Sequence, residues 1–345
     1  MIWTPLLLAD RSVNLRYLVL TRLLHHAEDE SEVKELISLR EKDPLVRDII
    51  RTQSADGSWS SLDGEKSQER DRVRTTSFIL LRLGYLGFPS HHPVVEKGVG
   101  FISKQQHRDG AWSMPHAYDG LSEPGRQYTM TPLQTSIPLL GVAACGHATD
   151  ESAEAAYEWL LSQHLDDGSW PAGKIGEVFG YQAGYRKMPH TKWGCRTNTT
   201  LALTCLALHP SRRRSVEAKR ALDLLLSRET RDKRNLGFNV ARIVGFENHR
   251  GNLTYHAKFD PGLVLDLCWR VGADKTDLRV RNLIDWTLEQ QNRYGLWQYE
   301  QRPEASRWVT YDILSSLSKI DESTDWYTSE LRTSYQSYSR KKKRF

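Results

Sequence analysis

Long apolar runs and paired cysteines are both missing from this chain of 345 residues. No segment reaches the roughly 18 apolar residues that span a bilayer, so we expect a soluble protein. The start, Met1 to Asp10, has a short apolar patch but no basic region and no small-residue cleavage site, which argues against a secretory signal. The four cysteines lack CxxC spacing, as is typical of reduced thiols. We therefore expect a cytoplasmic protein, with peripheral membrane contact left open.

Strand patterns and a strong charge imbalance are also lacking. No run alternates apolar and polar residues beyond a few positions, so an all-α protein is expected. The net charge of +5 is mild, and much of it lies in the basic tail at about 338–345. A terminal basic run is usually a solvated tail, and nothing else in the chain supports nucleic-acid binding. We expect no nucleic-acid partner, and the oligomeric state stays open.

What the chain has in abundance is aromatic residues, 11 Trp and 14 Tyr, and several Trp belong to a repeat. The sequence QSADGSW at 53–59 recurs as QHRDGAW at 106–112, as QHLDDGSW at 163–170 and as QNRYGLW at 291–297, with a degenerate Leu-Gly-Phe at 236–238. Asp-Gly predicts a turn in which Gly takes a positive φ and ends a helix. The Trp can fold back onto that helix, and the Gln amide can bond the end of a neighbouring helix.

Two kinds of helix are predicted around these turns. Before the turns, apolar residues fall at helical spacing on one face, as at Val95, Val99 and Ile102. Between the turns, other helices are apolar nearly all round, and such helices must be buried on every side. These all-apolar segments are 15–24, 75–87, 131–146, 199–208, 263–271 and 308–320, and a last amphipathic stretch starts at about Asp325.

Six pairs of this kind predict an (α/α)6 toroid, a double ring of helix pairs around a central cavity, formed by one domain over residues 1–345. The inner ring would hold the all-apolar helices and the outer ring the half-exposed ones. The alternative is an open helical solenoid, which also stacks helix pairs. An open array needs polar capping repeats and usually keeps a stricter period, so we favour closure.

The segment from Lys97 to Trp112 resembles the Gln–Trp motif of squalene and oxidosqualene cyclases. The same toroid occurs in the β subunits of protein prenyltransferases, and the chain is similar in length to single-domain prokaryotic members of this superfamily. The resemblance implies an apolar, aromatic-lined cavity inside the inner ring that fits a prenyl chain. It also implies an isoprenoid-handling enzyme, either terpene cyclase-like or prenyltransferase-like, with a small hydrophobic ligand.

The catalytic signatures of these relatives are incomplete. Triterpene-type cyclases protonate an alkene with an Asp-x-Asp-Asp motif, because clustered carboxylates keep one acid protonated. Here the one Asp-Asp pair, Asp166-Asp167, lies in a Gln–Trp turn. The nearest substitute is Asp260, which leads an inner helix. Its alternative role is an N-cap followed by Pro at the first helical position.

Protein prenyltransferases bind zinc through an Asp, a Cys two residues later and a His on a later inner helix. Asp266 and Cys268 have the first spacing, but no His follows position 256, and only Asp312 could replace it. We therefore expect neither zinc nor another metal site, and Mg²⁺ only if the substrate is a diphosphate. Asp260, Asp266 and Asp312 are our candidate catalytic residues.

Polar residues at the starts of inner helices and in three long connections, 114–130, 171–195 and 235–260, are candidates for substrate binding. Loops on one face of a repeat ring commonly bind ligands, and basic residues there can hold a diphosphate or carboxylate. The alternative is a solvated loop with ordinary charges. The candidates are Tyr128, Gln134, Trp193, Arg196, Tyr255, His256, Arg307 and Trp308.

Three functions remain open at this point. The first is an isoprenoid-handling enzyme with unusual catalytic residues. The second is a non-catalytic toroid that binds an isoprenoid or another lipid, which the missing signatures favour. The third is a carbohydrate-active (α/α)6 enzyme with a close pair of carboxylates, for which Asp260 and Asp312 are the candidates. The repeat disfavours this third function, because it accounts for many of the Trp residues as structural.

Overall fold

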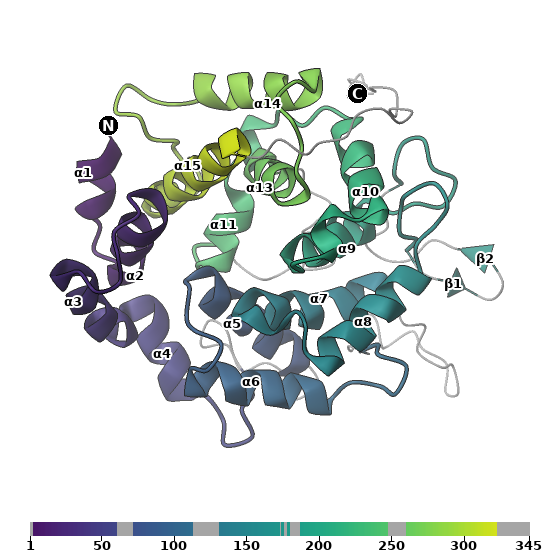
Figure 1. Cartoon of the computed structure of the whole chain (residues 1–345), viewed down its shortest axis with the longest axis horizontal. Coiled ribbons are helices and arrows are strands. Elements are labelled where there is room, and N and C mark those ends of the chain that lie inside the picture. The colour runs from purple at the N-terminus through teal and green to yellow at the C-terminus, as the bar shows by residue number, and fades with distance from the viewer. Residues whose placement is uncertain are drawn as a thin grey trace, which may run out of the picture.

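The computed structural model describes residues 3–60, 72–112, 131–172, 174–175, 178–179, 187–247 and 260–322. Their helices form two layers, and Figure 1 shows the outer helices surrounding an inner set. The inner layer consists of α2 (Val13–Leu18) with the π-helix η1 (Val19–Leu23), α5 (Arg72–Tyr85), α7 (Pro132–Val142) with the π-helix η5 (Ala143–His147), α9 (Arg196–Leu208), α13 (Pro261–Val271) and α15 (Ser306–Glu322). The outer layer contains α3 (Ser31–Leu39), α4 (Pro44–Thr52), α6 (Pro93–Lys104), α8 (Glu151–Ser162), α10 (Val216–Leu226) and α14 (Leu278–Glu289).

Shorter elements complete the described part of the chain. They are α1 (Trp3–Leu8), α11 (Phe238–Ile243), the 3-10 turns η2 (Arg40–Lys42), η6 (Arg212–Arg214), η7 (Lys233–Asn235) and η8 (Pro303–Ala305), and the strands β1 (Lys174–Ile175) and β2 (Val178–Phe179). The two strands form a small antiparallel hairpin that the sequence did not predict. The fold is nevertheless all-α, because this hairpin lies in a connection between α8 and α9.

The inner helices close into a ring. In chain order, α5 contacts α7, α7 contacts α9, α9 contacts α13, α13 contacts α15, and α15 returns to η1. The sixth contact lies just after α5, where a Cβ at Gly87 would be 2.8 Å from the Arg22 guanidinium of η1 and 3.6 Å from the Leu18 side chain of α2. The ring closes between the first and last inner helices, so the predicted α/α toroid is confirmed and an open solenoid is wrong. Every residue of α7 is buried, as the all-apolar pattern requires. The predicted last outer stretch, from about Asp325, and the basic tail lie outside the described residues.

Each intact repeat fastens an outer helix to the next inner helix through its Trp. The indole Nε1–H donates to a carbonyl of the preceding outer helix ten residues back, at 2.7–2.9 Å. The backbone N–H of the same Trp donates to a Thr hydroxyl near the start of the following inner helix. All four Trp side chains are fully buried. The Trp–Thr pairs are Trp59–Thr76, Trp112–Thr135, Trp170–Thr199 and Trp297–Thr310.

The Gly and Gln also act as predicted in the repeat at 106–112. Gly110 has φ +89°, and a Cβ there would lie 2.3 Å from the carbonyl oxygen of Ala155, so any side chain would clash with α8. The Gln106 Nε2 donates to the carbonyls of Gly110 and Ser152, at 2.8 and 2.7 Å. Ser152 lies at the start of α8, so the amide bonds a neighbouring helix end as expected.

None of the described helices is both long enough and apolar enough to cross a bilayer.

The Trp–Thr bonds can be tested with Thr135→Val, which keeps the shape of the side chain. The change leaves the buried N–H of Trp112 without its hydroxyl acceptor, so we expect a loss of about 1–3 kcal/mol in the free energy of unfolding. Thr204→Val is the matched control, since its hydroxyl bonds a carbonyl of its own helix α9. Urea unfolding would measure both variants. Equal stability of the two variants would contradict the role of the Trp–Thr bond.

Candidate active site

A cavity of about 230 Å³ lies inside the ring, and each of the six inner helices of the described chain contributes to its lining. The short helix α11 also contributes, because it packs against α5, α13 and α15. One side of the cavity is apolar and is formed by Leu81, Leu140, Ala144 and Leu208, and Ile243 of α11 and Leu263 of α13 add apolar surface. The other side is polar, which corrects our expectation of an apolar, aromatic-lined cavity.

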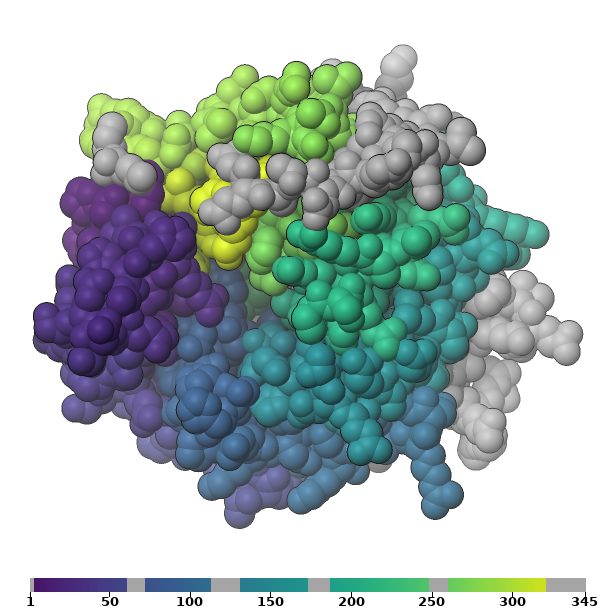
Figure 2. Space-filling view, viewed as in Figure 1, coloured from purple at the N-terminus to yellow at the C-terminus, as the bar shows by residue number. Residues whose placement is uncertain are grey.

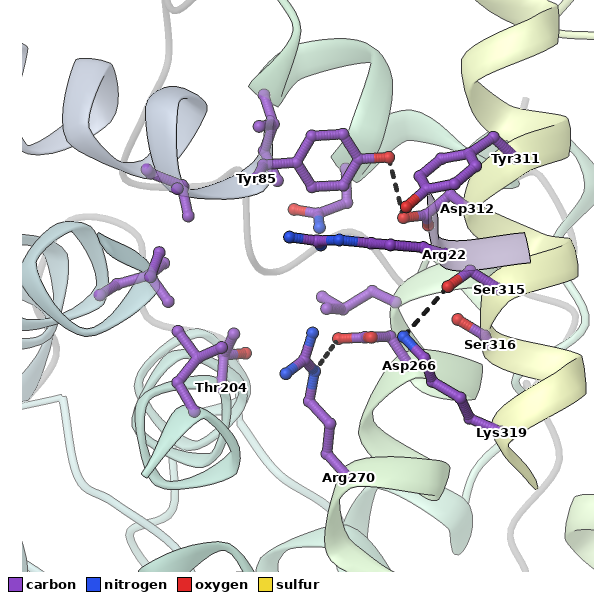
Figure 3. A pocket seen from close by; sticks show the side chains of 18 residues that line it. Arg22, Tyr85, Thr204, Asp266, Arg270, Tyr311, Asp312, Ser315, Ser316 and Lys319 are labelled. Atoms are coloured by element: carbon purple, nitrogen blue, oxygen red, sulfur yellow. Dashed lines mark hydrogen bonds and ion pairs between the residues drawn. The ribbon is translucent and has the colours of Figure 1, made fainter. Parts of the chain in front are cut away.

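The polar wall is formed by α13 and α15 together with the end of η1 (Figure 3). On α13 and on α15, helical spacing places the charged residues of this wall on the face directed toward the cavity. Asp266 and Arg270 are four residues apart on α13, and Asp312 and Lys319 are two turns apart on α15. Arg22 reaches the same space from η1. The cavity therefore holds five ionisable side chains beside its apolar surface.

Asp312 carries the most perturbed carboxyl group of the site. Its Oδ1 accepts a hydrogen bond from the Tyr85 hydroxyl at 3.1 Å, drawn as a dashed line in Figure 3. Burial, with smaller contributions from the charges of Asp266 and Asp260, raises the pKa of Asp312 to about 8. Asp312 is therefore mainly protonated at pH 7. A protonated carboxyl group facing a cavity is the arrangement required of a general acid.

Asp266 has a different environment on the same wall. Its Oδ2 accepts from the Arg270 Nε at 2.7 Å, and its Oδ1 accepts from the indole of Trp269 at 2.9 Å. The Lys319 ammonium donates to the Ser315 hydroxyl at 3.1 Å, and burial lowers the pKa of Lys319. The negative charge of Asp266 thus has a cationic partner, which suits a structural or electrostatic role better than proton donation.

Asp260 is the N-cap of α13, as the capping alternative predicted. Its carboxyl group is buried and accepts backbone N–H bonds from Gly237, Asn239 and Gly262, so it also ties α11 to α13. Burial raises the pKa of Asp260 to about 6, and the backbone bonds act against that rise. A Cβ at Gly262 would lie 3.2 Å from Asp260 Oδ1 and 3.9 Å from Asp312 Oδ2, so the two carboxyl groups flank the same glycine.

The side chains of Asp266 and Cys268, the two candidate zinc ligands, do not point into the same space. Side chains two positions apart on a helix point in directions about 200° apart. Accordingly, Asp266 lines the cavity and Cys268 does not. Cys268 is fully buried, and that burial raises the pKa of its thiol, which opposes the thiolate that zinc needs. Within the part of the chain that the structure describes, no three His, Cys, Asp or Glu residues are grouped as a metal site.

The described candidates for substrate binding lie away from the cavity lining. Arg307 pairs with Asp10 at 3.2 Å, because its position on α15 points toward the N-terminal segment. Trp308 is buried in the core, with its ring centroid 6.3 Å from that of Tyr85, and it contacts a cavity residue without lining the cavity. Neither Arg307 nor Trp308 therefore lines the cavity in which we expect the substrate to bind.

The remaining candidates are structural, superficial or outside the described residues. Gln134 forms a capping box at the start of α7, where its Oε1 accepts from the Thr131 N–H at 2.8 Å. Trp193 lies exposed on the surface, and Arg196 begins α9 without lining the cavity. Tyr128, Tyr255 and His256 fall outside the described residues. The polar residues that do line the cavity include Arg22, Tyr85, Arg270 and Lys319.

The raised pKa of Asp312 predicts a pH dependence of stability. Above the ordinary pKa of Asp, the unfolded chain loses this proton while the folded protein keeps it until about pH 8, so folding becomes less favourable as the pH rises between these values. Asp312→Asn removes this titration. We expect the free energy of unfolding of wild type to fall by roughly 4 kcal/mol more than that of Asp312→Asn between pH 5 and pH 9. Urea unfolding across this range would measure it.

The exposed Asp166 supplies the control for that experiment, since Asp166→Asn removes a surface carboxyl group and leaves the cavity unchanged. Parallel curves for wild type and Asp312→Asn would show that Asp312 titrates normally.

Comparison with known proteins agrees with this architecture. The family model of the squalene-hopene cyclase C-terminal domain matches residues 31–185. The squalene–hopene cyclase of Zymomonas mobilis is 27% identical over 123 residues, and that of Schizosaccharomyces japonicus is 28% identical over 186; each match covers 35% of this chain. The chain spans only 18% and 28% of the lengths of these two relatives.

Among solved structures, a type II terpene cyclase from Scytonema, in complex with geranylgeranyl dihydroxybenzoate, aligns with a TM-score of 0.47 at 15% identity, over 79% of this chain and 70% of that one. The family match ends at residue 185, but the same Trp–Thr bond recurs at Trp297 and Thr310, beyond the matched segment. Residues 31–185 are therefore similar to the squalene-hopene cyclase C-terminal domain, and the Trp–Thr bond of this α/α toroid continues beyond them.

Proposed function

We propose that the chain is a terpene cyclase-like enzyme that protonates an isoprenoid substrate in the central cavity, with Asp312 as the general acid. The observation that carries this proposal is that the Asp312 carboxyl group lines the central cavity, where burial raises its pKa to about 8. Asp260 and Asp266 keep supporting roles: their negative charges help to keep Asp312 protonated. The relatives named as squalene-hopene cyclases support the same class of substrate.

In this reaction the Asp312 O–H proton adds to one carbon of a substrate double bond. The π electrons form the new C–H bond, a carbocation is left on the neighbouring carbon, and Asp312 becomes a carboxylate. The Tyr85 hydroxyl, which donates to Asp312, stabilises that carboxylate. The faces of aromatic rings stabilise a nearby cation, and Tyr85 and Tyr311 both line the cavity. Attack of a second double bond of the substrate on this carbocation closes a ring. Loss of a proton to water then gives a new double bond, and Asp312 takes up a proton from solvent before the next turnover.

The size of the cavity favours a short isoprenoid. Pockets for small molecules usually measure about 300–1,000 Å³, whereas the described residues enclose about 230 Å³. A chain of two or three isoprene units fits this space better than a triterpene. Binding would come mainly from burial of the chain against Leu81, Leu140 and Leu208, at about 0.8 kcal/mol per buried methylene group.

Turnover in D₂O tests the proposal. Purified protein is incubated with C10, C15 and C20 prenyl alcohols, acids and diphosphates and with squalene, and products are identified by mass spectrometry. We expect a cyclised product that carries one deuterium from the protonation step. Asp312→Asn should lower the rate by about 10²- to 10⁴-fold, the usual contribution of a general acid. Asp166→Asn, in an exposed turn, is the control and should retain full activity.

Full activity of Asp312→Asn would exclude Asp312 as the acid. Thermal stabilisation by a prenyl compound without any product would instead favour the non-catalytic binding toroid.

A further inference from the structure

The polar wall of the cavity contains more positive than negative charge. Arg22, Arg270 and Lys319 line the cavity from η1, α13 and α15, while Asp266 and Asp312 are the carboxyl groups in the same lining. Because Asp312 is mainly protonated at pH 7, three cations face one ionised carboxylate there. Asp260 does not line the cavity, since its oxygens bond the backbone at the start of α13.

Arg270 and Lys319 are half-buried beside apolar surface, where less water solvates their charges than at exposed Arg22, and Asp266 compensates only one of these charges. The remaining positive charge would also oppose a substrate carbocation, since like charges repel at short range. Both costs fall if the ligand itself carries a negative group. The charges of this wall should therefore give an anionic isoprenoid a higher binding affinity than a neutral one.

We propose that this wall is a binding subsite for an anionic group, a carboxylate or a phosphate ester, at one end of the isoprenoid ligand. The residues of the subsite are Arg22, Arg270 and Lys319. This inference rests on the proposed function only in taking the ligand to be an isoprenoid.

The two cations of α13 and α15 are held in place by Trp269. The Arg270 guanidinium carbon and the Lys319 ammonium each lie 4.5 Å from the centre of the Trp269 ring. Asp266 fixes the Nε of Arg270, and Ser315 fixes the ammonium of Lys319. Such prior ordering lowers the entropic cost of binding an anion.

The geometry of the cavity separates the two ends of such a ligand. Figure 3 shows the guanidinium groups of Arg22 and Arg270 directed into the space between α15 and Thr204 of α9. The apolar residues Leu81, Leu140 and Leu208 belong to α5, α7 and α9, on the other side of that space. An anionic head beside α13 and α15 therefore directs a short prenyl tail toward α5, α7 and α9. In this orientation, Asp312 lies beside the ligand within the same cavity.

Binding of three matched C10 probes tests the subsite without turnover: geranic acid, geranyl monophosphate and geraniol, measured by titration calorimetry with the full chain. We expect the acid and the phosphate to bind at least 10-fold more tightly than geraniol at low salt, with a difference that shrinks as salt is added. The tighter of the two anions identifies whether the head group is a carboxylate or a phosphate.

Lys319→Met keeps the apolar stem and removes the charge, and Arg22→Gln removes a charge from an exposed side chain. Each change should weaken binding of the tighter anion by about 10-fold and leave geraniol binding unchanged. Lys104→Met, on the exposed side of the outer helix α6, is the control and should change neither. Equal affinity for all three probes, or anion binding that both cavity variants leave unchanged, would overturn the subsite.

These outcomes are separable from the proposed function. Anion-selective binding without deuterated product would leave the subsite standing and reject Asp312 catalysis. Equal affinity for the three probes, together with a deuterated product whose formation Asp312→Asn slows, would reject the subsite and leave the catalytic proposal standing.

Discussion

The structure depends on one packing constraint: helices that are apolar on all sides can be buried only if other helices surround each of them. Closing the inner helices into a ring satisfies this constraint and leaves a central space bounded by their side chains. Water in that space is limited, so charges there interact more strongly than at the surface. The raised pKa of Asp312 and the fixed Asp266–Arg270 pair both follow from their position in this enclosed space.

The outer ring fixes how the inner helices face the cavity. Each buried Trp joins the end of one outer helix to a Thr of the next inner helix, and this connection recurs four times in the described residues. Because a helix advances about 100° per residue, fixing one Thr fixes which side chains of that helix face inward. On α15, Thr310 bonds Trp297, while Asp312 faces the cavity two residues later. The repeat thereby positions the candidate acid.

Local sequence patterns predicted the elements of this fold well. The helix-ending glycines, the Gln amide bonds and the Asp260 cap all depend on residues within one turn and its neighbouring helix end. The polar wall could not be predicted in this way, because its residues come from segments about 250 and 300 positions apart. An apolar periodicity predicts that a helix exists, but it does not fix the rotation of the helix about its axis. It could therefore not show that Asp312 faces the cavity while Arg307 faces the N-terminal segment. The one available indication was charge within otherwise apolar helices, as at Asp266 and Arg270.

The central claim is that the ring keeps Asp312 protonated in the cavity at neutral pH. The most direct measurement is a ¹³C NMR titration of the protein labelled at its Asp carboxyl carbons, with the Asp312 resonance assigned from its absence in Asp312→Asn. This account predicts a midpoint near pH 8 for that resonance. A midpoint near the ordinary value of about 4 would contradict it, because Asp312 would then be an ionised carboxylate with no proton to donate.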